Sequence, residues 1–139
     1  MTKHELSAIL AKASRTELGE IAAQIKAGSE IEILKEPKKT LVMVKARESV
    51  KNSLFYLGEV LATECMVTVD SMKGISVIAG DDFEKAVSAA IIDGYLNGSK
   101  KKEAVIEKIQ ELGRQQKKKR EQLNRQIRKS KVNFNVMGE

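Results

Sequence analysis

The sequence has few of the residues on which disulfides, metal sites and thiol chemistry depend. Its 139 residues include one cysteine, Cys65, and one histidine, His4. A single cysteine cannot form an internal disulfide, and together with one histidine it cannot supply a cysteine-rich zinc site. No residue near Cys65 in the sequence offers the base that a nucleophilic thiol requires, so we interpret this cysteine as a small buried apolar residue.

Long apolar runs are absent as well. No stretch approaches the roughly 20 apolar residues of a membrane-spanning helix. The N-terminal residues begin an amphipathic pattern without an apolar signal region. The length and the 42% of hydrophobic residues fit one soluble globular domain. We therefore expect a cytoplasmic protein without membrane contact.

The familiar catalytic patterns are also missing. The sequence has no Walker A motif, no glycine-rich dinucleotide fingerprint, no paired histidines and no serine elbow. Glu59 and Glu64 lie five residues apart on a predicted strand, so they face opposite sides unless a bulge intervenes. Lys45 and Arg47 could hold a phosphate, although on an alternating strand such residues are more often simply surface residues. We expect no catalytic, cofactor-binding or metal-binding residue in this chain.

The positive charge is concentrated at the C-terminal end. The formal net charge is +6, yet residues 1–99 carry 12 Lys and Arg against 14 Asp and Glu, while residues 100–139 carry 13 against 5. Electrostatic attraction for phosphates or for an acidic partner therefore belongs to the C-terminal segment.

Residues 54–69 form the longest block that is rich in β-branched, aromatic and large aliphatic side chains. This composition predicts a strand around which the rest of the chain is organised. Because the segment is long for a strand, we expect Gly58 to mark a bulge or bend that divides it. Beyond that point Cys65, Val67 and Val69 share one face.

Two further strands and two short helices are predicted around this segment. Helical spacing predicts helices over residues 4–13 and 14–28, the second opened by a capping box from Ser14 to Glu17. Alternation predicts strands over residues 41–48 and 75–80. The first of these strands is preceded by a brief alternation at residues 30–35 and by a polar loop at 36–39 that holds the single proline. A turn is predicted at residues 49–53. Short connections favour an antiparallel meander of three to four strands.

A third helix is expected to open at residues 81–84, which have the spacing of an N-cap with its reciprocal acid. Small residues on this helix would let it approach the sheet closely, namely Ala86, Ala89, Ala90 and Gly94. We interpret Asp93 as a solvated surface acid. Gly98 is expected to end the helix.

The chain from residue 100 onward predicts a long basic helix. It is either a solvated helix or a helix that lies on an acidic protein or a phosphate, and the residues alone leave both open. Residues 132–137 alternate and predict a terminal edge strand that contains Phe134 and Val136. The expected organisation is thus a single α+β domain over residues 1–99, followed by a basic helical extension with a strand-like end over 100–139.

Two blocks of sequence, residues 40–48 and 55–64, resemble the PhnG family of the carbon–phosphorus lyase system. The turn at residues 80–82 with its alanine-rich helix and the segment 132–134 are similar to the family and follow in the same order. The chain departs from the family pattern at Thr40, Lys45 and Glu48, and lysine in place of arginine would weaken any bidentate contact made from position 45.

The resemblance implies a subunit of a bacterial assembly that transfers the ribose triphosphate moiety of ATP to a phosphonate such as methylphosphonate, with release of adenine. The implied activity is that of α-D-ribose 1-methylphosphonate 5-triphosphate synthase, a transferase, in which this chain acts as a scaffold. The implied partners are PhnI, PhnH and PhnL, together with PhnJ in the core of the assembly. The resemblance also leaves open a contact between two copies of this chain within the core. Mg-ATP would be the substrate of the whole complex, and the iron–sulfur and zinc sites would belong to other subunits.

The resemblance and the apolar pattern together give a set of residues expected at a partner interface: Phe55, Leu57, Gly58, Glu59, Glu64, Phe134 and Val136. A nucleic-acid-binding module is the alternative function, and it rests on the basic C-terminal segment alone. That segment lacks the interleaved aromatic residues on which bases stack, so a nucleic-acid partner is the less favoured hypothesis.

Overall fold

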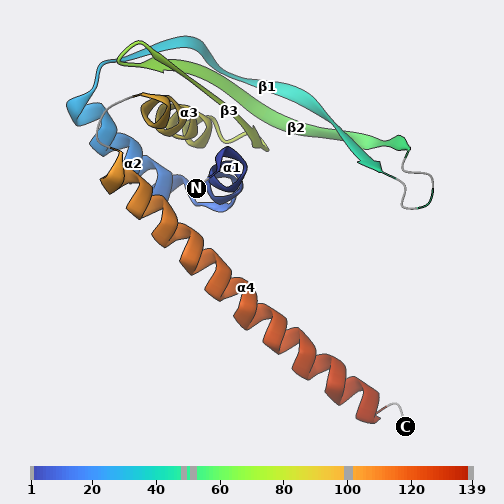
Figure 1. Cartoon of the computed structure of the whole chain (residues 1–139). Helices are drawn as coiled ribbons and strands as arrows, with labels where there is room; N and C mark the ends of the chain where they lie inside the picture. Colours follow the sequence, from blue (N-terminus) through green and yellow to red (C-terminus); the bar gives the residue numbers. More distant parts are fainter. Residues whose placement is uncertain (1, 48–49, 51–52, 99–101, 138–139) are drawn as a thin grey trace. The chain divides into compact units, whose positions relative to one another are not determined.

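The computed structural model describes residues 2–47, 50, 53–98 and 102–137. The elements along the chain are α1 (Lys3–Lys12), α2 (Arg15–Gly28), β1 (Ile31–Arg47), β2 (Leu54–Val69), β3 (Met72–Ala79), α3 (Phe83–Asn97) and α4 (Glu103–Met137) (Figure 1). The three strands form one antiparallel sheet in the order β1-β2-β3. The α+β class and the meander expected from the sequence are therefore confirmed.

The elements belong to two compact units. The first contains α1 and α4, and the second contains α2, the three strands and α3. None of the described helices is long and apolar enough to cross a membrane.

In the second unit, α2 begins with the predicted capping box. The Ser14 hydroxyl accepts a hydrogen bond from the backbone N–H of Glu17 at 3.1 Å, and the Glu17 carboxylate accepts one from the backbone N–H of Ser14 at 3.0 Å. Together they satisfy two backbone N–H groups that the first turn of a helix leaves without partners. The helix packs against α3 and buries Leu18, Ile21, Ala22 and Ile25.

The central strand β2 supplies most of the core of the sheet. Alternate residues of β2 are buried on one face, namely Thr63, Cys65, Val67 and Val69. The β3 residues that pair with the first three of them, Ile78, Ser76 and Gly74, are buried as well. Helix α3 covers this face (Figure 1). The buried Ser76 hydroxyl donates a hydrogen bond to the carbonyl of Ala86 at 2.6 Å, which leaves no unpaired polar atom at that contact.

Glycines set the distance between α3 and β3. A Cβ added at Gly74 would collide with the backbone of Ala90 and Gly94. A Cβ added at Gly94 would lie 3.2 Å from the Met72 carbonyl oxygen and 3.3 Å from the Gly74 Cα. The close approach that the small residues of this helix predict is thus present, and it is tightest where two glycines face each other.

Asp93 does not have the solvated role expected for it. Its carboxylate accepts a hydrogen bond from the backbone N–H of Ile75 at 3.0 Å. Four residues further along α3, the Asn97 amide donates to the carbonyl of Lys73 at 2.9 Å. These two side chains occupy the hydrogen-bonding positions that a fourth strand would use, because Lys73 and Ile75 both present backbone groups to the outer edge of β3.

The polar loop predicted at residues 36–39 is wrong, because β1 is a continuous strand through this region. The pairing of β1 with β2 shifts register between Ile33 and Lys35 and again between Lys35 and Lys38. Pro37 lies within the second shift. Proline cannot donate a ladder hydrogen bond, and an irregular position on an edge strand is where a sheet tolerates it.

The terminal edge strand is also wrong, because α4 is helical to Met137. No glycine or proline stands between Gly113 and Gly138, so nothing in the sequence interrupts the helix. Alternation over only six residues is weak evidence for a strand, and Val132 and Val136 also have the spacing of one helix face. The side chains of Phe134 and Val136 lie outside what the structure describes, as do residues 48–49 and 51–52 of the predicted turn.

Candidate functional site

The hairpin of β1 and β2 extends well past β3. Strand β1 pairs with β2 from Ile31 opposite Val69 to Arg47 opposite Leu54. Strand β3 pairs only with the part of β2 from Ala62 to Val69. Residues 41–47 and 54–61 therefore form a two-stranded projection, which we name the β-arm (Figure 1).

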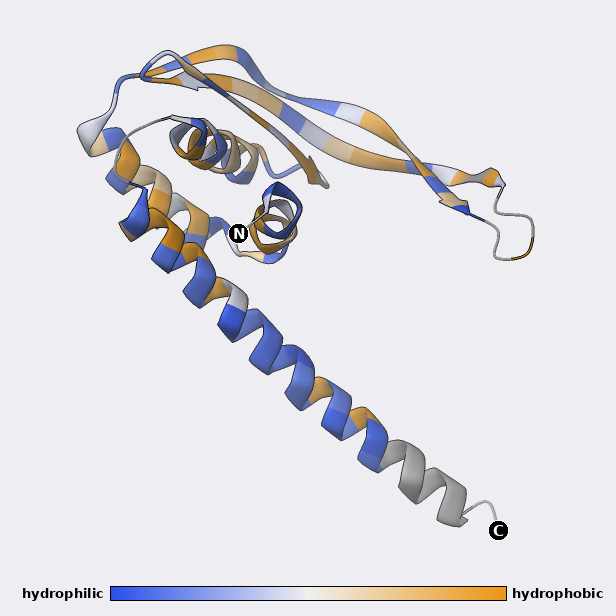
Figure 2. Ribbon diagram, in the orientation of Figure 1, coloured by the Kyte–Doolittle hydropathy of each residue, from blue (hydrophilic) through white to orange (hydrophobic). Residues whose placement is uncertain are grey.

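The β-arm exposes aliphatic side chains on both faces. Leu41 and Leu61 are cross-strand partners on one face and are 62% and 42% exposed. Val42 and Val60 are partners on the other face and are 38% and 41% exposed. Figure 2 shows the alternating apolar and polar segments along the two strands. A two-stranded ribbon cannot bury both of its own faces, and contiguous exposed apolar residues mark interaction sites.

A bulge lies within the β-arm at the position predicted from Gly58. Val44 is opposite Gly58, but Lys45 is opposite Tyr56, so Leu57 is an extra residue in β2. Gly58 has a φ of 157°, and a Cβ added there would have no heavy atom within 4 Å. Glycine is therefore required by the backbone conformation and not by lack of space.

The structure brings together some of the residues expected at a partner interface. Leu57 and Glu59 lie in the β-arm beside Gly58, and both are exposed. Glu64 lies nearer the core of the sheet, with one carboxylate oxygen 3.7 Å from the Lys38 amino group. The backbone of Phe55 pairs with Ala46 in the β-arm. The side chain of Phe55 lies outside the described residues, and Phe134 and Val136 belong to the other unit.

One face of β1 carries a pattern that the sequence interpretation missed. Because side chains alternate along a strand, Lys39, Leu41, Met43 and Lys45 share a face, and all of them are exposed. No carboxylate among the described residues lies within ion-pair distance of Lys39 or Lys45. The alternation was visible in the sequence, but the predicted loop at residues 36–39 removed Lys39 from the strand.

Cys65 has the structural role expected for it. Its thiol is buried and donates to the carbonyl oxygen of Lys35 at 3.5 Å. Burial raises the pKa of the Cys65 thiol above its ordinary value, which disfavours the reactive thiolate. Among the described residues, no group of three or more His, Cys, Asp or Glu side chains is placed to hold a metal ion.

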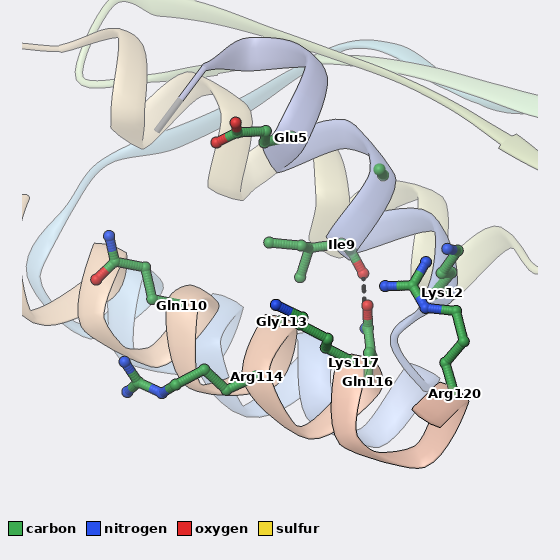
Figure 3. Close-up of a pocket in the computed structure, with 10 residues that line it drawn as sticks. Glu5, Ile9, Lys12, Gln110, Gly113, Arg114, Gln116, Lys117 and Arg120 are labelled. Carbon is green, nitrogen blue, oxygen red and sulfur yellow. Dashed lines mark hydrogen bonds between the residues drawn. The ribbon is translucent and has the colours of Figure 1, made fainter. Parts of the chain in front are cut away.

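A groove in the first unit is the second candidate site. It has a volume of about 610 Å³ and lies between α1 and α4. Basic side chains dominate its lining, namely Lys12, Arg114, Lys117 and Arg120, with Glu5 as the one acid (Figure 3). Ile9 contributes the apolar floor, where a Cβ added at Gly113 would lie 2.9 Å from the Ile9 Cδ1.

The packing of α4 against α1 accounts for most of the side chains that line this groove. The Gln116 amide donates to the Ile9 carbonyl at 3.1 Å, so α4 caps the last turn of α1. Arg114 is held by two hydrogen bonds to Glu111, at 2.6 and 3.0 Å. Lys12 and Arg120 lie near the C-terminal end of α1, where the helix dipole favours cations (Figure 3). The β-arm is therefore the stronger candidate.

A family model described as phosphonate metabolism protein PhnG matches residues 1–138 of the chain. The chain belongs to the PhnG family. The resemblance inferred from residues 40–48 and 55–64 is thus confirmed, and both blocks fall largely within the β-arm. A comparison with curated proteins finds no match. Membership of the PhnG family assigns the chain to phosphonate metabolism.

Proposed function

We propose that this chain is a scaffold subunit of a bacterial carbon–phosphorus lyase assembly in the cytoplasm. In this proposal it acts with PhnI, PhnH and PhnL, and with PhnJ in the core, in the transfer step. That step breaks the glycosidic bond of Mg-ATP, joins the ribose C1 to a phosphonate oxygen and releases adenine. Family membership supports the pathway. In this proposal the catalytic groups and the iron–sulfur and zinc sites belong to other subunits.

The exposed β-arm is the observation that carries the scaffold role. Burying a leucine or valine side chain contributes roughly 1.5–3 kcal/mol relative to leaving it in water. Leu41, Met43, Leu57 and Leu61 are all exposed in this chain. A partner that covered them would gain a stable contact, whereas a stand-alone enzyme would leave this surface open to aggregation.

The test replaces apolar surface in the β-arm without disturbing the fold. Leu41→Thr with Leu61→Thr keeps residues that favour strands, so the thermal melting of the chain should stay close to that of the parent. Co-expression with PhnI, PhnH, PhnJ and PhnL should then yield less of the assembled complex and less release of adenine from ATP.

Ile75→Thr with Val77→Thr is the matched control, because both residues are exposed in β3 outside the β-arm. The control should retain the partners of the parent. Full assembly of the β-arm variant would contradict the role given to this surface. Failure of the parent to purify with any of these subunits would contradict the proposed function itself.

A nucleic-acid-binding module remains the second candidate function. Residues 117–129 of α4 are exposed and predominantly basic, which gives a strip of positive charge. Binding of arbitrary duplex DNA that weakens steeply with salt would favour this function. Purification of the chain with PhnI, without a DNA shift at physiological salt, would favour the subunit role.

A further inference from the structure

The two edges of the sheet are treated differently. At the outer edge of β3, Asp93 and Asn97 hydrogen-bond the backbone of Ile75 and Lys73. Strand β1 forms the other edge, and among the described residues no strand pairs with its outer side. Exposed edges invite pairing with another chain, so proteins usually block them. This chain blocks one edge with side chains and leaves the longer edge available.

The open edge carries a defined chemical pattern. On one face of β1, Lys39 and Lys45 are six residues apart and flank Leu41 and Met43. The two aliphatic side chains are exposed, and the two lysines have no carboxylate partner among the described residues. A strand added at this edge would place its own side chains directly opposite these four residues.

We propose that residues 39–45 of β1 are the docking site for a strand from a partner protein, with acidic residues six apart and apolar residues two and four positions after the first acid. The acids would lie opposite Lys39 and Lys45, and the apolar residues opposite Leu41 and Met43. The pattern is the same in both directions, so it fits parallel and antiparallel addition. The inference rests on the proposed function, because it specifies how the scaffold engages its partner.

A second copy of this chain fits the edge poorly. Antiparallel pairing of two copies about Val42 would set Leu41 opposite Met43, which is favourable, but Lys39 opposite Lys45. Like charges directly opposite each other destabilise a sheet. Nucleic acid would satisfy the lysines but would not bury the two aliphatic side chains between them. An acidic strand satisfies both parts of the pattern.

The experiment uses the full chain co-expressed with PhnI, PhnH, PhnJ and PhnL. A photo-crosslinking residue at position 41 should join the chain to one segment, and mass spectrometry should identify in it the acid, apolar, apolar, acid spacing. Lys39→Glu with Lys45→Glu should weaken purification with that partner on the order of tenfold. Replacing the two acids of the crosslinked segment by lysine should restore binding to this charge-reversed variant alone.

The control is Lys26→Glu with Lys73→Glu, which makes the same change in net charge at exposed positions of the same unit. It should bind like the parent. A crosslink to a second copy of this chain, a crosslink to a segment without the acidic spacing, or a reversed variant that binds like the parent would each overturn the inference. Retention of the crosslinked partner by the reversed variant would overturn the inference and leave the proposed function intact. Absence of all these subunits from the parent purification would reject both.

Discussion

Gly94 of α3 lies so close to Gly74 of β3 that a Cβ on Gly94 would be 3.3 Å from the Gly74 Cα. This contact also fixes the position of the residues beside it on the helix. Asp93 and Asn97 reach the backbone of Ile75 and Lys73 because α3 lies directly on the strand at this point. Close packing of two glycines therefore accounts for the blocked edge of β3.

Alanine at position 74 should destabilise the second unit. The added methyl group would collide with backbone atoms of Ala90 and Gly94, which cannot move aside as a flexible side chain can. Overpacking of this kind costs on the order of 1–3 kcal/mol. Thermal unfolding should show a lower melting temperature, by roughly 4–8 °C for each kcal/mol in a domain of this size.

Gly19→Ala is the matched control for this change. Gly19 lies within α2, and a Cβ there would have no heavy atom within 4 Å. Since alanine favours a helix over glycine, this variant should melt at or above the temperature of the parent. A Gly74→Ala protein that melts like Gly19→Ala would show that α3 is not held against β3 at this position.

Removing the Asp93 carboxylate should open the blocked edge of β3. Asp93→Ala leaves the N–H of Ile75 without its acceptor. The loss of a hydrogen bond to a charged group costs roughly 1.5–3 kcal/mol, less where water can replace it. Amide hydrogen exchange at Ile75 should accelerate, while Asp81→Ala, at an exposed acid for which no hydrogen bond is found among the described residues, should leave it unchanged. Equal exchange in the two variants would contradict the role of Asp93.

The sequence could predict the local elements better than the contacts between them. The capping box at Ser14, the bulge at Gly58 and the helix after Asp82 follow from short-range rules, and all three are present. The role of Asp93 could not be predicted in this way, because it depends on which turn of α3 faces β3. Nothing in the local sequence distinguishes an acid that bonds a strand edge from one in water.

Asp82 should make part of the stability depend on pH at the acid end. Partial burial alone would raise the pKa of Asp82, but hydrogen bonds from the backbone of Lys85 and from the Arg15 guanidinium lower the pKa below its ordinary value. A lowered pKa in the folded state adds stability above the unfolded pKa of about 3.9. That stability is lost as the pH falls through the folded pKa.

Asp82→Asn removes the charge of residue 82 but keeps the helix cap, because asparagine is also a good N-cap residue. The variant should be less stable than the parent at pH 7, and the difference should shrink below about pH 4. Glu84→Gln is the control, since Glu84 is exposed and its carboxylate lies 3.7 Å from Arg15. Denaturant unfolding at a series of pH values gives the comparison, and a constant difference between Asp82→Asn and the parent would contradict the assignment.

The candidate site was only partly predictable. Leu57, Gly58 and Glu59 could be selected from their strand and their glycine, and the structure places them on the β-arm. The lysine pattern on β1 was missed because Pro37 indicated a loop, whereas two register shifts keep the strand intact. The length of the β-arm could not be predicted for a different reason. It depends on where β3 stops pairing with β2, which no property of β1 reveals.

The last prediction concerns Gly58 and Glu59 in the β-arm. Gly58→Val forces a β-branched residue into a backbone conformation with φ of 157°, although there is space for the side chain. Strain at such a position is on the order of 1–3 kcal/mol. The variant should either lose the bulge or destabilise the β-arm, so less soluble and assembled complex should be recovered. Amide exchange in residues 54–61 should accelerate.

Glu59→Gln is the companion change, because Glu59 is exposed beside the bulge and opposite Met43. It should melt like the parent, since no ion pair of Glu59 is found among the described residues. If the bulge presents this carboxylate to a partner, co-purification with PhnI should weaken without any loss of stability. Thermal melting beside co-purification distinguishes the two variants. A Gly58→Val protein that melts and assembles like the parent would show that the bulge does not require glycine, and that the shape of the β-arm has another cause.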